Sequence, residues 1–268
     1  MEGRVSTDNG DVQGDRCELL RRGRIMSLKE TLKRIVVNPI RKIMTPLMVP
    51  AIDHSLNKDS RDIERWRRRK ALDETGRFVD EHMADIQSDS DCLGVLNRAI
   101  RLMDTAKEGL VCEFGVATGR TINHIARKLP TKTIFGFDSS EGLPEDWRDG
   151  LPKGTYARST MPRVRDNVRL VKGLFRDTLP DFLAKNDGPA LFLHVDCDLY
   201  SSTRTVLDLF QERIGPGTVI VFDEYFNYPG WQDGEFKAFR EFCEKNGRTF
   251  EYAGYCRYNS QVAVKIGG

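Results

Sequence analysis

Apolar residues follow one spacing in the first hundred residues and another beyond Gly109. In 27–40, Ile63–Met83 and Cys92–Ala106, apolar side chains recur three or four positions apart, as on one face of a helix. Ser27 precedes the first of these segments and is a suitable N-cap, whereas Pro39 and Pro46 are expected to interrupt it. These patterns predict three helices in the first part of the chain.

Beyond Gly109, short β-rich runs alternate with helical segments. The expected strands are Leu110–Phe114, Thr133–Phe137, Val168–Val171, Ala190–Val195, Thr218–Phe222, Thr249–Tyr255 and Gln261–Ile266. The expected helices are Thr121–Leu129, Pro180–Lys185, Ser202–Ile214 and Gly234–Asn246, with Pro180 in the first turn of its helix. Strands that are apolar throughout and alternate with helices predict an α/β fold. We expect a Rossmann-like, doubly wound, mostly parallel sheet with an antiparallel C-terminal strand and an N-terminal helical extension.

Charge divides the chain in the same way. The first 70 residues contain 17 basic and 10 acidic residues, whereas the remaining 198 contain 25 basic and 30 acidic residues. Residues 1–25 are polar and lack periodicity, which predicts a disordered tail. The expected organisation is therefore a tail (1–25), a basic helical extension or lid (26–91) and an α/β domain (92–268).

The extension combines apolar residues at helical spacing with Lys and Arg. Such a helix can pack on its own domain or on a second copy of the chain, and this homo-oligomeric or packed arrangement is the favoured interpretation. It can also lie on an anionic membrane surface through Ser27–Ile52. Binding to nucleic acid is disfavoured, because the basic turn Arg65–Lys70 has no accompanying aromatic sheet.

The sequence also indicates a cellular compartment. Six cysteines occur without a Cys-x-x-Cys pair, and three of them (Cys112, Cys197 and Cys243) lie in apolar segments, which is typical of reduced thiols. The first residues do not resemble a signal peptide, and the apolar stretch Ile43–Ile52 is too short to span a bilayer. A cytoplasmic protein is expected.

The segment after the first strand of the α/β part has a ligand-binding pattern. Glu113 is followed by Gly115 and Gly119, and a helix starts at once, so that backbone N–H groups can face a ligand. The pattern is neither the dinucleotide fingerprint nor a P-loop. A tight turn that simply needs glycine is the alternative.

Asp138 follows the next strand, at the same edge of a parallel sheet. A carboxylate in this position can accept hydrogen bonds from both ribose hydroxyls of a nucleoside. An adenosine-containing cofactor is therefore expected, and a pyrophosphate is less suitable because Glu113 would repel it.

Acidic residues also follow the two neighbouring strands. Asp196 and Asp198 come after one strand, and Asp223 and Glu224 come after the other. Four carboxylates at one crevice favour a divalent cation such as Mg²⁺. His194 lies within its strand, where a buried structural histidine is the more common interpretation.

Five segments in a fixed order resemble a known family. They are Glu113–Gly119 (EFGVATG), Phe137–Pro144 (FDSSEGLP), Gly173–Pro180 (GLFRDTLP), His194–Tyr200 (HVDCDLY) and Phe222–Tyr225 (FDEY). Together they are similar to class I S-adenosylmethionine-dependent methyltransferases of the macrocin O-methyltransferase (TylF-like) group, over about residues 92–266.

The resemblance implies a metal-assisted O-methyltransferase that modifies a hydroxyl of a sugar, a glycan or a glycosylated small molecule. It implies that S-adenosylmethionine contacts Glu113, Gly115, Thr118, Gly119, Thr121, Asp138, Ser139 and Asp196. It implies metal ligation by Asp196, Asp223 and Glu224, with Asp198 or Asp196 as the general base. Glu224 departs from the family pattern, where a second aspartate is usual, so the identity of the metal is left open.

Two other classes of function remain. Asp196-Cys197-Asp198 also fits the Asp-x-Asp motif of nucleotide-sugar glycosyltransferases, although Asp138 would then have no role. A non-catalytic binding module with a retained cofactor fold is the second. The segment Asn227–Gln232 either shapes an acceptor pocket or forms an ordered loop around a buried Trp231.

Overall fold

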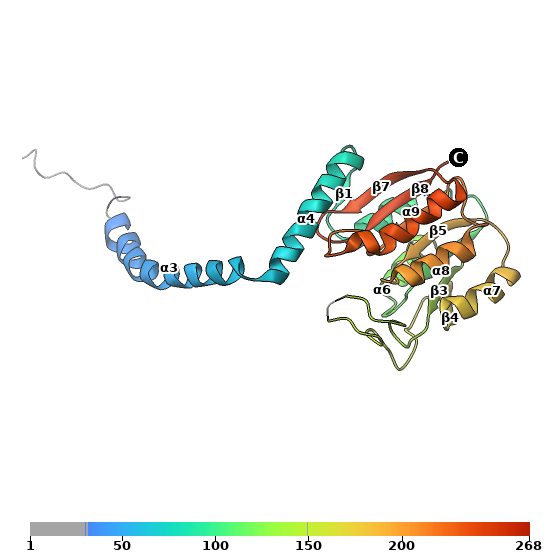
Figure 1. Cartoon of the computed structure of the whole chain (residues 1–268), viewed down its shortest axis with the longest axis horizontal. Helices are drawn as coiled ribbons and strands as arrows, with labels where there is room; N and C mark the ends of the chain where they lie inside the picture. The colour runs from blue at the N-terminus through green and yellow to red at the C-terminus, as the bar shows by residue number, and fades with distance from the viewer. Residues whose placement is uncertain (1–29, 31, 149) are drawn as a thin grey trace, which may run out of the picture. The chain divides into compact units, whose positions relative to one another are not determined.

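The computed structural model describes residues 30, 32–148 and 150–268 (Figure 1). The predicted disordered tail and the expected N-cap Ser27 lie outside these residues. Contacts within the chain divide it into two compact units, Met1–Asp62 and Ile63–Gly268.

The first unit contains one long helix. A π-helical turn, Lys33–Val37, leads into α3, Asn38–Ser60. The expected interruption was wrong, because α3 continues through both Pro46 and Pro50. Pro39 lies in the first turn of α3, directly after the π-helical turn. No helix among the described residues is long and apolar enough to cross a membrane.

The second unit is built on one eight-stranded sheet with the order β1-β7-β8-β6-β5-β2-β3-β4. The strands are β1 Ser88–Asp89, β2 Leu110–Phe114, β3 Ile134–Asp138, β4 Val168–Lys172, β5 Ala190–Val195, β6 Val219–Phe222, β7 Phe250–Cys256 and β8 Val262–Ile266. Only β8 runs antiparallel to its neighbours, β6 and β7. The predicted doubly wound sheet is therefore confirmed.

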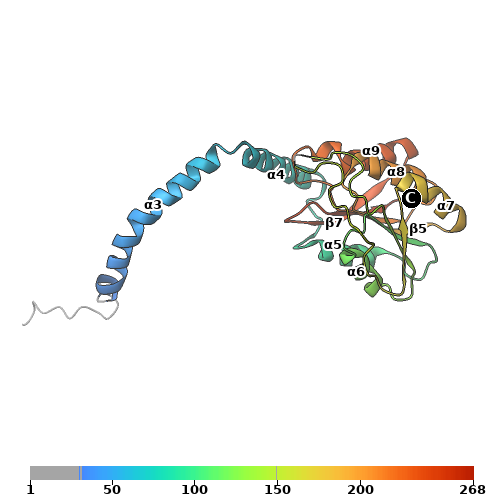
Figure 2. The same cartoon turned by 90° about the horizontal axis from the view of Figure 1, so that it is seen from below.

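Helices cover both faces of this sheet (Figures 1 and 2). One face carries α5, Cys92–Leu102, and α6, Arg120–Lys128, over a core of aliphatic residues. The other carries α7, Phe175–Lys185, α8, Tyr200–Phe210, and α9, Glu235–Asn246, over a core rich in phenylalanine. Helix α7 begins five residues earlier than predicted, so that Pro180 lies in its second turn.

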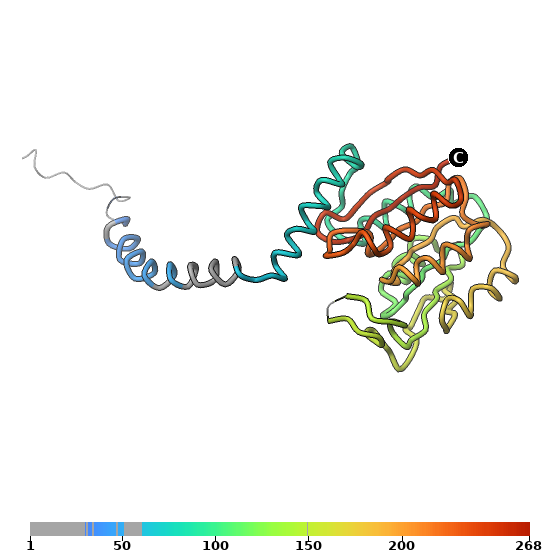
Figure 3. The backbone as a smooth tube through the Cα atoms, viewed as in Figure 1, coloured from blue at the N-terminus to red at the C-terminus, as the bar shows by residue number. Residues whose placement is uncertain are grey.

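The second unit begins at Ile63, ahead of the predicted domain start at Cys92. Helix α4, Ile63–His82, packs Phe78 edge-on against Trp231 and Phe236, and Phe78 also contacts Tyr252 of β7. In the backbone trace α4, in teal, runs beside the red C-terminal strands (Figure 3). Sequence periodicity could not show that this helix joins the sheet's aromatic core.

The segment Asn227–Gln232 is an ordered loop against α4. The N–H of Asn227 donates to Thr75 Oγ1 over 3.0 Å, and Trp231 is buried against Phe78 and Phe236. The loop lines no part of the cavity described below, which favours the second of its two interpretations. Of the cysteines, those that the structure describes are free thiols.

Candidate functional site

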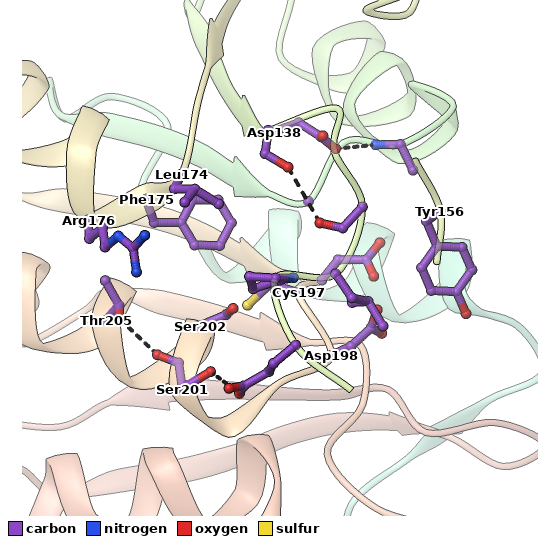
Figure 4. Close-up of a pocket in the computed structure, with 18 of the residues that line it drawn as sticks. Asp138, Tyr156, Leu174, Phe175, Arg176, Cys197, Asp198, Ser201, Ser202 and Thr205 are labelled. Carbon is purple, nitrogen blue, oxygen red and sulfur yellow. Dashed lines mark hydrogen bonds between the residues drawn. The ribbon is translucent and has the colours of Figure 1, made fainter. Parts of the chain in front are cut away.

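A cavity of about 510 Å³ opens at the carboxyl ends of the central strands (Figure 4). Ligand sites in doubly wound sheets lie at this edge, and the volume suits a small molecule. Every one of the five neighbouring strands β4, β3, β2, β5 and β6 contributes lining residues. They are Gly115 and Ala117 after β2, Asp138 and Ser139 at the end of β3, Gly173–Arg176 after β4, Asp196–Asp198 after β5, and Asp223 and Glu224 after β6.

Gly115 allows the chain to turn tightly between β2 and the cavity. Its φ of +92° is a left-handed conformation that favours glycine. A Cβ here would overlap the backbone carbonyl oxygen of Asp196, because the ends of β2 and β5 approach each other closely. The glycine is therefore required by the close approach of two cavity-lining segments.

Asp138 fixes the glycine turn from the neighbouring strand. Its Oδ2 accepts hydrogen bonds from the N–H groups of Val116 at 2.9 Å and Ala117 at 2.8 Å, and its Oδ1 accepts from Ser140 at 2.6 Å. A carboxylate has about four acceptor positions, so these bonds leave room for roughly one more donor. Asp138 therefore both shapes the turn and remains able to bind a hydroxyl group in the cavity.

Glu113, which was predicted to contact the cofactor, does not line the cavity. It is fully buried at the end of β2, where it pairs with its cross-strand neighbour His194. Glu113 Oε2 lies 2.9 Å from His194 Nδ1, and Oε1 accepts a hydrogen bond from Thr121 Oγ1 at 3.1 Å. The carboxylate thus holds the imidazole through one oxygen and Thr121 through the other.

His194 lies between two acids. Burial favours its neutral form, but the carboxylates of Asp223 and Glu113 outweigh burial and raise the pKa of the imidazole. His194 Nε2 is 3.6 Å from Asp223 Oδ1, beyond hydrogen-bond distance, and has no hydrogen-bond partner among the described residues. His194, Asp196 and Asp223 each place one potential ligand atom within 4.8 Å of the others.

Asp198 has an unusual backbone. Its φ of +64° is left-handed, and its side chain is nearly buried while still lining the cavity. Burial and the nearby charge of Asp223 raise the pKa of Asp198 to about 7, and Arg148 opposes this rise. A carboxyl group with a pKa near neutral can both accept and release a proton.

Glu224 lines the same cavity but points toward a different partner. Its Oε1 lies 4.0 Å from Arg148 Nη2, and its backbone N–H donates to the buried carboxylate of Glu235 at 3.0 Å. Burial raises the pKa of Glu224 to about 8, with Arg148 lowering and Asp223 raising it. Arg148 in turn stacks over Trp147 at 4.0 Å and over Tyr228 at 4.8 Å.

The structure brings seven predicted site residues to the cavity. They are Gly115, Asp138, Ser139, Asp196, Asp198, Asp223 and Glu224. Besides Glu113, three predicted residues are not part of the lining: Thr118 and Gly119 directly precede α6, and Thr121 lies in its first turn. Glu224 does not join the group of converging ligand atoms, whose third member is His194 instead.

Other lining residues were not predicted. Leu174 and Phe175 form one side of the cavity, and Tyr156 from the long β3–β4 connection faces it from the opposite side (Figure 4). Ser201 of α8 donates to Glu145 of that connection at 2.6 Å. The motif GLFRDTLP after β4 could have indicated Leu174 and Phe175, whereas only the fold brings the β3–β4 connection to the cavity.

Comparison with known proteins bears on this site. Residues 112–225 match a family model described as a methyltransferase domain. The match spans β2 to the end of β6, the part of the sheet that surrounds the cavity.

Two curated relatives and one solved structure resemble the chain. A tetracenomycin-pathway enzyme of Streptomyces olivaceus, 8-demethyl-8-(2,3-dimethoxy-alpha-L-rhamnosyl)-tetracenomycin-C 4'-O-methyltransferase, is 37% identical over 113 residues, covering 35% of this chain and 42% of the relative. Demethyldecarbamoylnovobiocin O-methyltransferase of Streptomyces niveus is 28% identical over 134 residues, covering 42% and 50%. The chain therefore spans half or less of the length of these relatives. The calicheamicin methyltransferase CalS11 superposes with a TM-score of 0.53 at 23% identity, over 65% of this chain and 77% of that one.

These findings confirm the recognition of a class I methyltransferase domain. The CalS11 similarity supports the fold alone, which is the sheet described above. The narrower TylF-like grouping stays a prediction.

Proposed function

We propose that the protein is an S-adenosylmethionine-dependent O-methyltransferase that acts on a hydroxyl of a sugar, a glycan or a glycosylated small molecule. The observation that carries the proposal is the cavity at the strand ends of the methyltransferase domain, formed around Gly115, Asp138 and Asp196. The two curated relatives are named as O-methyltransferases, and the name of the first gives a rhamnosyl-bearing substrate, which favours the same acceptor class.

The cavity offers separate surfaces for the parts of the donor. The free acceptor position on Asp138 suits a ribose hydroxyl, and the apolar side of Leu174 and Phe175 suits a flat adenine ring. The glycine turn at Gly115 leaves space for the methionine part beside Asp196. S-adenosylmethionine supplies an electrophilic methyl group, so the chain mainly has to orient donor and acceptor.

Acceptor activation falls to the acidic side of the cavity. Asp198 is placed to take the hydroxyl proton, because it lines the cavity beside Asp196 and Asp223. The arrangement also fits a divalent cation. His194 Nε2 is a buried potential ligand atom beside two carboxylates, and it has no hydrogen-bond partner among the described residues. A bound cation, Mg²⁺ or another, would lower the pKa of an acceptor hydroxyl. Asp196 and Asp223 are the residues that would hold it. The family resemblance implies Glu224 as a third ligand, whereas the third converging ligand atom in the structure is His194 Nε2.

Binding distinguishes this function from its rivals. A thermal-shift screen of the full chain with S-adenosylhomocysteine, UDP and NAD, each with and without Mg²⁺, should show stabilisation by S-adenosylhomocysteine. Chelation should leave that stabilisation in place, because the proposed donor contacts with Asp138, Leu174 and Phe175 do not need a cation. Stabilisation by UDP instead would indicate the Asp-x-Asp glycosyltransferase, and no stabilisation by any nucleoside would indicate a non-catalytic module.

The helical extension gives a second proposal, that α3 rests on an anionic membrane surface. Between residues 31 and 52 the sequence has basic residues and no acidic one. Apolar side chains of its described part are exposed, among them Ile35, Ile40 and Ile43. This combination is typical of interfacial helices. A second copy of the chain is the competing partner, and free thiols in the described part of the chain favour a cytoplasmic location.

A further inference from the structure

The imidazole of His194 has one satisfied and one unsatisfied nitrogen. Nδ1 pairs with Glu113 Oε2 at 2.9 Å, and Nε2 has no hydrogen-bond partner in the described part of the chain. The side chain is completely buried, so bulk water does not compensate. Buried polar atoms without partners are uncommon and costly, and one that persists beside a functional cavity needs an explanation.

The unsatisfied nitrogen faces acidic neighbours. His194 Nε2 lies 3.6 Å from Asp223 Oδ1, and a carboxylate oxygen of Asp196 completes a group whose atoms are all within 4.8 Å of one another. Asp196 and Asp223 line the cavity, whereas His194 lies behind them on β5. One nitrogen and two carboxylate oxygens therefore converge from two adjacent strand ends.

Glu113 gives the histidine the orientation expected of a metal ligand. Metal-bound histidines usually donate their other ring N–H to a carboxylate, which fixes the tautomer and raises the basicity of the ligating nitrogen. The 2.9 Å contact between Nδ1 and Glu113 Oε2 has this form, and Thr121 Oγ1 holds the second oxygen of Glu113 at 3.1 Å. The ring is thereby held with Nε2 toward Asp223.

We propose that His194 Nε2, Asp196 and Asp223 bind a divalent transition-metal ion of the Mn²⁺ type, with Glu113 as a positioning residue and Glu224 outside the ligand set. The role of the ion in methyl transfer rests on the proposed function, whereas the binding of the ion does not. Glu224 is excluded because its carboxylate faces Arg148 at 4.0 Å and does not belong to the converging group.

The donor set determines which ions bind well. Mg²⁺ and Ca²⁺ prefer oxygen ligands alone, whereas imidazole nitrogen suits first-row transition metals. A site with one imidazole and two carboxylates should therefore prefer Mn²⁺, Co²⁺ or Zn²⁺ to Mg²⁺. This preference differs from what Asp196, Asp223 and Glu224 would show, since that set contains only oxygen.

The direct test is pulsed electron paramagnetic resonance of the full chain loaded with Mn²⁺, because electron spin-echo modulation detects a nitrogen nucleus bound to the ion. The wild type should bind one Mn²⁺ and show the ¹⁴N modulation of a coordinated imidazole. His194→Gln should lose the modulation, and calorimetry should show Mn²⁺ binding weakened by at least about 10- to 100-fold, the loss typical even of outer-shell changes. Glu224→Gln should keep the modulation.

The control is His124→Gln, which removes another buried histidine. His124 lies on α6 and is hydrogen-bonded to Asn97 and Arg127. It should keep the nitrogen signal. His194→Gln leaves the buried Glu113 without its partner and can fail to fold. The wild-type spectrum alone therefore also decides the question. Bound Mn²⁺ without nitrogen modulation, or an absence of Mn²⁺ binding, would overturn the proposal. Loss of S-adenosylhomocysteine binding would refute the proposed function and leave the metal result standing.

Discussion

Replacement of Gly115 by alanine tests the close approach of the two strand ends that form the cavity. Alanine at a left-handed φ costs about 1–2 kcal/mol, and overpacking typically costs a further ~1–3 kcal/mol. A Cβ at Gly115 would meet both penalties, because φ is +92° and the methyl group overlaps the Asp196 carbonyl oxygen. We expect the free energy of unfolding of Gly115→Ala to fall by about 2–5 kcal/mol, as the sum of these two terms.

The same substitution should damage ligand binding. Relief of the overlap moves either the glycine turn or the segment after β5, and both line the cavity. Calorimetry should show S-adenosylhomocysteine bound at least about tenfold more weakly, which corresponds to ~1.4 kcal/mol. Urea denaturation of the same samples gives the stability change.

Gly217 provides a matched control. It has the same φ of +92°, but a Cβ there meets nothing within 4 Å, and it precedes β6 at the opposite edge of the sheet. Gly217→Ala should therefore lose only the conformational term, about 1–2 kcal/mol, and bind S-adenosylhomocysteine normally. If Gly115→Ala matched Gly217→Ala in both stability and affinity, the argument from the strand-end contact would be refuted.

Three further predictions concern separate parts of the chain. Asp138→Ala should weaken S-adenosylhomocysteine binding by about 1.5–3 kcal/mol in calorimetry, because it removes a charged acceptor. The remote surface change Asp208→Ala should leave the affinity unchanged. Equal affinities of the two variants would exclude Asp138 from the donor site. Burial and Arg127 lower the pKa of His124, whose Nδ1 accepts from Arg127 and whose Nε2 pairs with Asn97, so protonation is easier in the unfolded chain. Stability should therefore fall as pH decreases below about 6.5, and urea denaturation at pH 7.5 and 5.5 should show a smaller fall for His124→Gln than for wild type; an identical fall would contradict this assignment. The full chain should sediment with anionic but not neutral vesicles, and Ile40→Asp with Ile43→Asp should abolish this; sedimentation unaffected by the double change, or a dimer without vesicle binding, would reject the membrane contact.

Much of the fold follows from local sequence pattern. Runs such as Leu110–Phe114 and Ala190–Val195 are apolar apart from Glu113 and His194, as expected of strands buried on both faces, and both strands have the predicted bounds. The prediction failed at two elements in the first part of the chain. Helix α3 continues through Pro46 and Pro50, and the pairing of β1 with β7 involves only two residues.

The candidate site shows the same division. Strand order alone places Asp138, Asp196 and Asp223 at one edge, because parallel strands end together. The position of Glu113 could not be predicted from its place before the glycine turn. Its side chain points into the sheet, where the cross-strand neighbour His194 binds it, and such a pair 81 positions apart leaves no local signal.

The central claim is that the cavity binds S-adenosylmethionine, and a crystal structure with S-adenosylhomocysteine tests it most directly. The account predicts the ligand in the cavity of Figure 4, with its ribose on Asp138, its adenine beside Leu174 and Phe175, and its sulfur toward Asp196 and Asp198. A nucleoside bound elsewhere, or a ligand that leaves Asp138 uncontacted, would contradict it.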